Sequence, residues 1–111
     1  MKQYKVRVTR QALNHLRSIK SYIAIELAVP EVAQKVLETL WLEMKKLSEM
    51  PERIKIIEEE PWKSLEIRRQ IVNNFYVYFW ISEEKKQVQI IAVIYSKMDQ
   101  DKQLKNLSFK M

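Results

Sequence analysis

Cysteine and glycine are both absent from the 111 residues of this chain. Without cysteine, neither a disulfide framework nor a thiolate metal site can form, and a reducing cytoplasm is the expected location. Without glycine, the chain lacks the glycine-rich loops that hold nucleotide phosphates, so we expect no nucleotide cofactor. The first ten residues alternate charged with apolar side chains, which is the pattern of neither a signal peptide nor a membrane anchor.

Histidine is nearly absent too, because His15 is the only one. It has no partner at a suitable spacing, which favours a solvated or packing role over a catalytic one. The acidic run from Glu58 to Glu60 could bind a cation. Consecutive carboxylates without a second group of ligands are more typical of a solvated loop. We therefore expect no metal and no other cofactor.

The composition is that of a folded, basic protein. Apolar residues make up 47% and charged residues 31%, a globular balance. The length suits one domain, residues 1–111, around one core. Lysine and arginine number 20 against 14 acids, and six of them precede the first acid, Glu26. Such a positive field attracts polyanions and acidic proteins alike, although each charge could equally be a solvated surface residue.

The N-terminal half predicts one strand and two helices. Residues 4–8 alternate apolar with polar side chains, as in a strand with one buried face. Thr9 can cap a following helix, and Pro30 suits the first residue of a second helix that should stop before Pro51. The apolar stripe of the first helix is Ala12, Leu13, Leu16, Ile19, Ile23 and Leu27, and that of the second is Ala33, Val36, Leu37, Leu40, Met44 and Leu47. The short connection predicts an antiparallel helix hairpin.

The C-terminal half predicts a meander of strands. Residues 51–61 have no periodicity and predict a surface connection. The apolar segments 65–72, 75–81 and 88–95 follow, separated by short polar breaks that suit hairpin turns. At the first break, Asn73 and Asn74 can form a two-residue turn, because asparagine tolerates positive φ.

Two further features of this half concern its last segments. Residues 90–94 are apolar at every position, which is typical of a central strand covered on both faces. A last polar helix is expected at about residues 99–107. The order of strand, helix hairpin and three-stranded antiparallel meander predicts an α+β fold with the helices packed on one face of a single sheet.

The other face of that sheet is the open question. Along residues 75–81, alternate side chains point to opposite faces of the sheet. The set expected to meet the helices is Phe75, Val77, Phe79 and Ile81, and the set expected on the open face is Tyr76, Tyr78 and Trp80.

One combination of motifs has a family resemblance. Residues 67–80, Ile-Arg-Arg-Gln-Ile-Val-Asn-Asn-Phe-Tyr-Val-Tyr-Phe-Trp, contain an arginine strand, a turn and an aromatic strand. A charged turn, an aliphatic strand and a basic tail closed by Asp99 come next. With the opening Tyr-Lys-Val-Arg-Val-Thr and two helices, this order resembles the RelE/ParE superfamily of bacterial toxins over about residues 4–104. Each motif is short, so the ordered combination carries the resemblance.

The resemblance implies two helices on a twisted sheet and a protein partner. The partner is the antitoxin of a type II toxin–antitoxin system, whose flexible segment wraps the toxin and neutralises it in a hetero-oligomer. The resemblance also implies a cellular target of one of two kinds. RelE-like toxins cleave messenger RNA on the ribosome, whereas ParE-like toxins poison DNA gyrase without known hydrolysis of their own.

For a ribonuclease, the resemblance implies Arg68, Tyr95 and Lys97 as catalytic residues. RNA cleavage by a 2′-hydroxyl needs a base, an acid and cations against the phosphate. Arg68 could clamp a phosphate with two hydrogen bonds, or form only a surface ion pair or an antitoxin contact. Tyr95 needs a lowered pKa to move a proton, and could instead be a half-buried strand residue. In RelE-like nucleases the last strand usually supplies another arginine, and the position that looks equivalent here is Ala92. Met98 replaces the second of the family's two closing cations.

Two further sets of residues are expected to make contacts. Arg69, Lys63 and Asp99 are expected to meet nucleic acid or the target. Arg69 has the same parity as Ile67 and Ile71, so it lies either at a bulge or around the sheet edge.

The aromatic row of Tyr76, Tyr78 and Trp80 could stack on RNA bases. We favour it as the apolar floor on which an antitoxin helix lies, because a bare aromatic row needs a partner. The edge strand at residues 65–72 could also accept a strand from that partner.

The sequence therefore predicts the toxin of a type II toxin–antitoxin module. The missing arginine favours gyrase poisoning slightly over ribosome-dependent RNA cleavage, and so leaves open whether the chain is an enzyme. A different alternative is a non-toxic module of the same fold that binds protein or nucleic acid.

Overall fold

The structure, a computed structural model, describes residues 3–98 and contains one four-stranded sheet of order β1-β4-β3-β2. The strands are β1 (Lys5–Val8), β2 (Arg68–Val72), β3 (Phe75–Ser82) and β4 (Gln87–Tyr95). The last three form the predicted antiparallel meander, and β1 pairs in parallel with β4. The α+β fold is confirmed, with β4 in the central place that its apolar run predicts. The helix expected at residues 99–107, and Asp99, lie outside the described residues.

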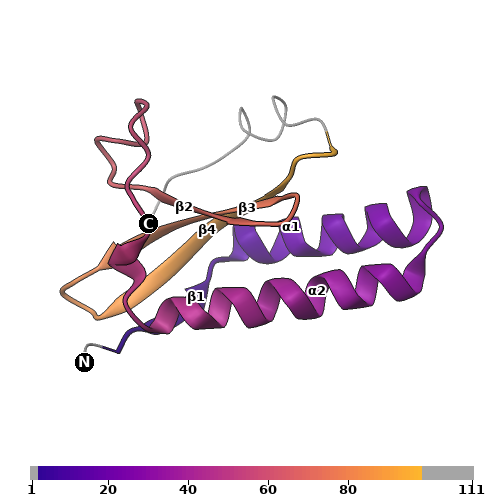
Figure 1. The fold of residues 1–111 in the computed structure, drawn as a ribbon, viewed down its shortest axis with the longest axis horizontal. Coiled ribbons are helices and arrows are strands. Elements are labelled where there is room, and N and C mark those ends of the chain that lie inside the picture. Colours follow the sequence, from indigo (N-terminus) through magenta and orange to yellow (C-terminus); the bar gives the residue numbers. More distant parts are fainter. Residues whose placement is uncertain (1–2, 99–111) are drawn as a thin grey trace.

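Two helices cover one face of the sheet (Figure 1). They are α1 (Arg10–Ser21) and α2 (Pro30–Lys45), which Pro30 opens as predicted. The first helix does not continue in α geometry to Leu27, because Tyr22–Glu26 forms a π-helix. Its wider turn lets Ile23 stay buried while the Tyr22 ring meets the Tyr95 ring edge-on at 5.9 Å.

The connection between α2 and β2 differs most from the expectation. The strand predicted over residues 65–72 begins only at Arg68, because Glu66 has a left-handed φ of 56° that interrupts the extended chain. Residues 51–61 lie largely on the surface, as predicted, but they also make apolar contacts that the sequence analysis did not expect. Ile54 packs against the main core, and Ile57 packs on the opposite face of the sheet. We call residues 54–67 the strap.

The main core lies between the helices and the sheet. Every second residue of β3 points into it, as the alternation predicted. Its buried members include Ala12, Leu16, Ile19, Ile23, Ala33, Leu40, Met44, Leu47, Phe75, Val77, Phe79, Val88, Ile90 and Val93.

The N-terminus of α1 takes over the hydrogen bonding of β4 where β1 ends. Within the described residues, the β4 edge beyond Ile90 has no strand beside it. The Thr9 hydroxyl donates to the Ile90 carbonyl at 2.8 Å and accepts from the Ala12 amide at 3.3 Å, so it is also the predicted helix cap. The side-chain amide of Gln11 donates to the Ile91 carbonyl at 2.9 Å. Side chains thus satisfy backbone groups that a strand would otherwise pair.

The single histidine has a structural role in the same seam. Nδ1 of His15 accepts a hydrogen bond from the Val93 amide at 3.2 Å. Burial lowers the pKa of His15 below its usual value of 6.5. The neutral ring is the form that can accept this bond, so the packing role expected for His15 fits its surroundings.

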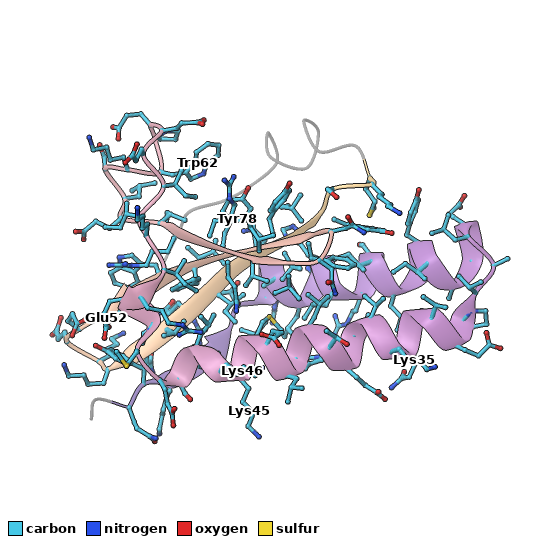
Figure 2. The ribbon with its side chains drawn as sticks, viewed as in Figure 1. Lys35, Lys45, Lys46, Glu52, Trp62 and Tyr78 are labelled. Atoms are coloured by element: carbon cyan, nitrogen blue, oxygen red, sulfur yellow. The ribbon has the colours of Figure 1, made fainter. Side chains whose placement is uncertain are left out.

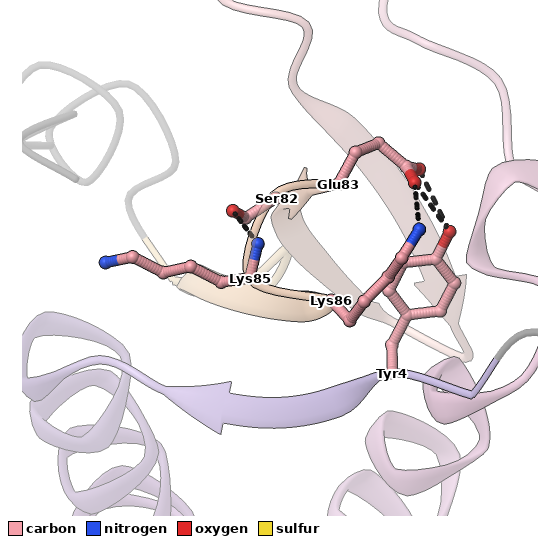
Figure 3. A network of polar contacts seen from close by, with 5 residues as sticks. All are labelled: Tyr4, Ser82, Glu83, Lys85 and Lys86. Carbon is pink, nitrogen blue, oxygen red and sulfur yellow. Dashed lines mark hydrogen bonds and ion pairs between the residues drawn. The ribbon is translucent and has the colours of Figure 1, made fainter.

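The N-terminal segment is tied to the turn between β3 and β4 (Figure 3). The Tyr4 hydroxyl donates to both carboxylate oxygens of Glu83, at 2.9 and 3.1 Å. Lys86 pairs with Glu83 at 3.1 Å and lies 5.7 Å from the Tyr4 ring centre. Burial, and then the bond to Glu83, raises the pKa of Tyr4 to about 12. Within the turn, the Lys85 amide donates to the Ser82 hydroxyl at 3.2 Å.

Thr9→Val tests the seam between α1 and β4. The substitution keeps the shape but removes the helix cap and the donor to Ile90, so the free energy of unfolding should fall by about 1–3 kcal/mol. Thr39→Val, at an exposed position of α2, is the control and should change it by less than about 0.5 kcal/mol. Urea unfolding measures both. If Thr9→Val and Thr39→Val lowered the free energy of unfolding equally, the hydrogen bonds of Thr9 would not stabilise the fold specifically.

His15→Asn tests the titration of the seam. Asparagine retains an acceptor near Nδ1 but cannot be protonated. Because the folded pKa of His15 lies below 6.5, the unfolded state binds more protons as the pH falls through that range. The wild type should therefore lose stability between pH 7 and 5 relative to His15→Asn, and keep its full stability above pH 7. Parallel pH profiles of the two proteins would contradict this account.

Candidate functional site

The open face of the sheet is covered at its centre by the strap. The predicted parity is confirmed, because Tyr76, Tyr78 and Trp80 all lie on the face opposite the helices. The prediction of a bare aromatic row is wrong at Tyr78, which is only 2% exposed. The Trp62 ring lies 6.3 Å from the Tyr78 ring at an angle of 30°, and Figure 2 shows the two side chains together.

A second apolar cluster forms beneath the strap. Its buried members are Ile67, Tyr78, Ile91, Ala92 and Ile94, and its partly buried members are Ile57, Trp62, Leu65, Tyr76 and Trp80. The sequence analysis missed the strap residues, although isoleucines inside a charged segment were a signal of burial. Tyr76 and Trp80, on either side of Tyr78, remain partly exposed.

A bulge in β4 widens this cluster. Tyr78 pairs with Ala92 and Phe79 pairs with Ile90, which leaves Ile91 as an extra residue. Ala92, the position at which a RelE-like nuclease was expected to have an arginine, is fully buried. A charged side chain at that position would need a buried partner, so alanine is consistent with the closed strap.

Arg68 holds the base of the strap. Its guanidinium donates to the carbonyls of Glu52, at 3.1 Å, and Ile54. Ile56 forms a bridge with Arg68, and the Ile57 amide donates to the Ile67 carbonyl at 2.9 Å. This arginine is therefore committed to backbone carbonyls of its own chain.

The tip of the strap carries Lys63 and the acidic run. Lys63 is exposed there. The carboxylate of Glu60 accepts from the Ser64 amide at 2.8 Å and from the Ser64 hydroxyl, so one of the three acids closes a turn. Among the described residues, no three His, Asp or Glu side chains gather as metal ligands would.

Arg69 lies on the open face beside the β2 edge. It pairs with Tyr78 in the register, and its guanidinium is 5.2 Å from the Tyr76 ring centre. The bulge is in β4, so Arg69 does not lie at a bulge. Its guanidinium lies over the Tyr76 ring on the open face and does not reach around the sheet edge. Together with Lys55 and Ile71 it lines a shallow pocket of about 380 Å³ that the strap closes on one side.

The three candidate catalytic residues are not brought together. Arg68 pairs with Phe79 near the middle of β3, whereas Tyr95 pairs with Phe75, four residues earlier at the start of that strand. That separation is about 13 Å along the strand. Tyr95 is buried on the helix side, stacked on Phe75 at 4.5 Å, and Lys97 is exposed beyond it.

A second surface, which the sequence analysis did not single out, lies between β1 and α2. It is an open groove of about 580 Å³. The lining residues are Val6, Val8, Glu38, Trp41, Leu42, Met44 and Lys45. Trp41 and Leu42 are 44% and 59% exposed, so the groove is apolar and uncovered within residues 3–98. In that part of the chain, no helix is long and apolar enough to cross a membrane.

Comparisons with known proteins agree on one kind of relative. Residues 6–100 match the family model of the ParE toxin of the type II toxin–antitoxin system parDE. The fold is similar to that in a chromosomal ParDE toxin–antitoxin system from P. aeruginosa, with a TM-score of 0.69, 20% identity, and 86% of this chain and 98% of that one covered. No curated protein sequence matches the chain.

Two RelE-type structures are also similar in fold. The RelBE2 toxin–antitoxin complex from Mycobacterium tuberculosis has a TM-score of 0.60, 22% identity, and 86% and 93% coverage. A free, doubly substituted E. coli toxin RelE has a TM-score of 0.59, 17% identity, and 93% and 96% coverage. The architecture is thus shared by toxins of both types.

Substitutions at Trp62 test the strap. Trp62→Ala should lower the free energy of unfolding by about 2–4 kcal/mol, because it removes the ring that covers Tyr78. Trp62→Phe should cost less than about 1 kcal/mol, because it keeps a ring and removes an indole N–H that is buried without a partner among the described residues. Denaturant unfolding measures both. A negligible loss for Trp62→Ala would mean that the strap does not pack on the sheet.

Proposed function

The chain belongs to the family of ParE toxins of type II toxin–antitoxin systems, and from this membership we propose that it inhibits growth by poisoning DNA gyrase in the cytoplasm. On this proposal the toxin acts by binding and catalyses no hydrolysis of its own. An antitoxin that forms a hetero-oligomer with the chain neutralises it.

The arrangement of the candidate catalytic residues supports a binding mechanism. A nuclease needs its base, acid and cations within reach of one phosphate. Arg68 is bound to two backbone carbonyls beside the middle of β3, while the Tyr95 ring is buried at the start of that strand. This separation is the observation that carries the proposal, because Arg68 and Tyr95 lie too far apart to act together on one phosphate.

The surface charge suits a target that carries nucleic acid. Lys5, Arg7, Arg10, Arg17 and Lys20 are all exposed, and no acid interrupts this part of the sequence. Gyrase bound to DNA presents phosphates, which attract such a field from a distance. We propose Arg69 and Lys63 as further contacts of the target, since both are exposed on the strap side of the sheet.

Expression and two assays with the purified protein test this function. The chain expressed alone should arrest bacterial growth, and the purified protein should trap gyrase–DNA cleavage complexes. It should leave ribosome-bound messenger RNA intact. Cleavage of that RNA without any effect on gyrase would establish the RelE-like alternative, and normal growth would favour the non-toxic binding module.

Tyr95→Phe separates the two toxin mechanisms within one protein. The variant keeps the ring that stacks on Phe75, so it should fold and arrest growth as the wild type does. A ribonuclease that used the hydroxyl as an acid or base would instead lose about 100-fold or more of its cleavage rate. Growth arrest under an inducible promoter, with thermal unfolding as the control for folding, gives the answer.

A further inference from the structure

We propose that the connection between α1 and α2 is the surface through which the toxin engages its protein target, and that the target receives it in an apolar cleft with a positively charged rim. We call residues 25–32 the hairpin tip. This inference rests on the proposed function, since it names the surface that contacts the protein part of DNA-bound gyrase.

The hairpin tip is an uninterrupted exposed segment. All of residues 25–32 are exposed, and Ile25 is 74% exposed. The other large aliphatic side chains of the tip are Leu27, Val29 and Val32. The sequence analysis placed Leu27 on the buried stripe of the first helix, and this expectation is wrong, because the π-helix ends just before it. Contiguous exposed apolar side chains, unlike scattered ones, are typical of an interaction site.

Hydrogen bonds fix the shape of the hairpin tip. The Leu27 amide donates to the Tyr22 carbonyl at 3.1 Å, and the Val29 amide donates to the Ile23 carbonyl at 3.2 Å. Between them, Ala28 has a left-handed φ of 55°, which is uncommon for a residue with a Cβ. A connection that is already fixed loses little conformational entropy when it binds. The tip therefore presents its aliphatic side chains in one arrangement.

The hairpin tip projects from the body of the protein. Figure 1 shows the two helices extending past the end of the sheet to the connection between them. Ile23 and Ala33, which come just before and just after the tip, are buried in the main core. The tip is thus an exposed projection on a packed base, a shape that complements a cleft better than a flat surface.

The charge of the tip is opposite to that of the whole chain. The chain has a net charge of +6, yet residues 21–34 contain no lysine or arginine, and their two acids are Glu26 and Glu31. Both acids are exposed. Cations return at the base of the tip, where Arg17 and Lys35 line two shallow pockets. The end of the tip therefore disfavours nucleic acid and acidic proteins, and favours a protein surface that carries cations.

A DNA-bound target offers the matching surface. A protein that holds DNA carries lysines and arginines where it meets the phosphates, so clefts beside the DNA are positively charged. Lys5, Arg7 and Arg10 precede or open α1, and Arg10 lies about 20 Å along the helix from Ile25. The basic end would meet DNA phosphates while the tip enters the protein. Each end of the first helix then has its own partner within one protein–DNA complex.

A second copy of this chain is a poorer occupant. Pairing of two tips would bring Glu26 and Glu31 of one copy against the same acids of the other, and like charges repel. A single short connection also gives little area for a stable dimer of the usual size. A larger protein can surround the tip on several sides.

Matched lysine substitutions test the tip. Ile25→Lys places a cation against the expected cationic rim and should raise the toxin concentration for half-maximal trapping of gyrase–DNA cleavage complexes about tenfold or more. Met50→Lys, at a position 56% exposed beyond the other end of α2, should change that concentration less than about twofold. Thermal unfolding confirms that both variants fold. Equal trapping by the two variants would overturn the inference.

The charge of the cleft has its own test. Glu26→Gln combined with Glu31→Gln keeps the size of both side chains and should raise the half-maximal concentration about threefold or more. Glu38→Gln, further along α2 and outside the tip, should change it less than about twofold. Unchanged or stronger trapping by the double variant would overturn the positively charged rim.

A single introduced thiol reports the contact directly. Because the chain has no cysteine, Ile25→Cys carries one thiol for a benzophenone photocrosslinker, and Met50→Cys is its control. In the complex with gyrase and DNA, the label at position 25 should crosslink to gyrase protein severalfold more than the label at position 50. Crosslinks from position 25 mainly to DNA, to a second toxin, or to the product of the neighbouring open reading frame would contradict the proposal.

Growth assays keep this inference separate from the proposed function. Ile25→Lys should lose growth arrest and Met50→Lys should retain it. If the wild type and both variants trap gyrase equally, the tip is wrong but the proposed function stands. If the wild type arrests growth without trapping gyrase, gyrase is the wrong target. Loss of arrest in Ile25→Lys alone then still supports the tip as the target surface, and retained arrest overturns it. A wild type that arrests nothing makes both proposals wrong.

Discussion

The fold depends on β4, which the rest of the chain surrounds. β1 and β3 pair with its two edges, and α1 completes the edge that β1 leaves open through Thr9, Gln11 and His15. The helices pack on one face and the strap on the other. Burying a strand on both faces requires that nearly all its backbone groups find partners, because an unpaired buried amide or carbonyl costs about 1–3 kcal/mol. The side chains at the start of α1 therefore satisfy backbone groups of β4 that β1 does not reach.

Much of this fold follows from local patterns in the sequence. The alternation in β3 identifies its two faces, the unbroken apolar run in β4 identifies a central strand, and Thr9 and Pro30 identify helix starts. These signals work because each depends on neighbours along the chain. The parallel place of β1 beside β4 depends on residues about 80 positions apart, and no local pattern encodes it.

The strap shows why the candidate site was harder to predict than the fold. Its apolar residues, including Ile57 and Trp62, are irregularly spaced among charges, so no period of two or 3.6 reveals a buried face. Glu66 takes a left-handed backbone conformation that nothing in its residue type favours. For this reason the sequence analysis expected an antitoxin to cover Tyr78, whereas Trp62 of the same chain covers it. Arg68 is a similar case, since a strand arginine can bind a phosphate or a carbonyl, and only the folded strap decides between them.

The closed strap also changes where recognition can occur. Within residues 3–98, side chains of the same chain cover most of both sheet faces, so the exposed polar groups lie at the sheet edges, on the strap and on the outer surfaces of the helices. A toxin that acts by binding needs surfaces for a target and for a neutralising partner, and these need not coincide with a catalytic centre. If they overlap, neutralisation is simple competition. If they are separate, neutralisation requires either steric blocking by the bulk of the partner or a shift between two states of the toxin that each ligand binds differently. The hydrogen bonds of Thr9, Gln11 and His15 tie the start of α1 to β4, so a second arrangement of this region would have to break them. Steric blocking needs no such change and is the simpler of the two.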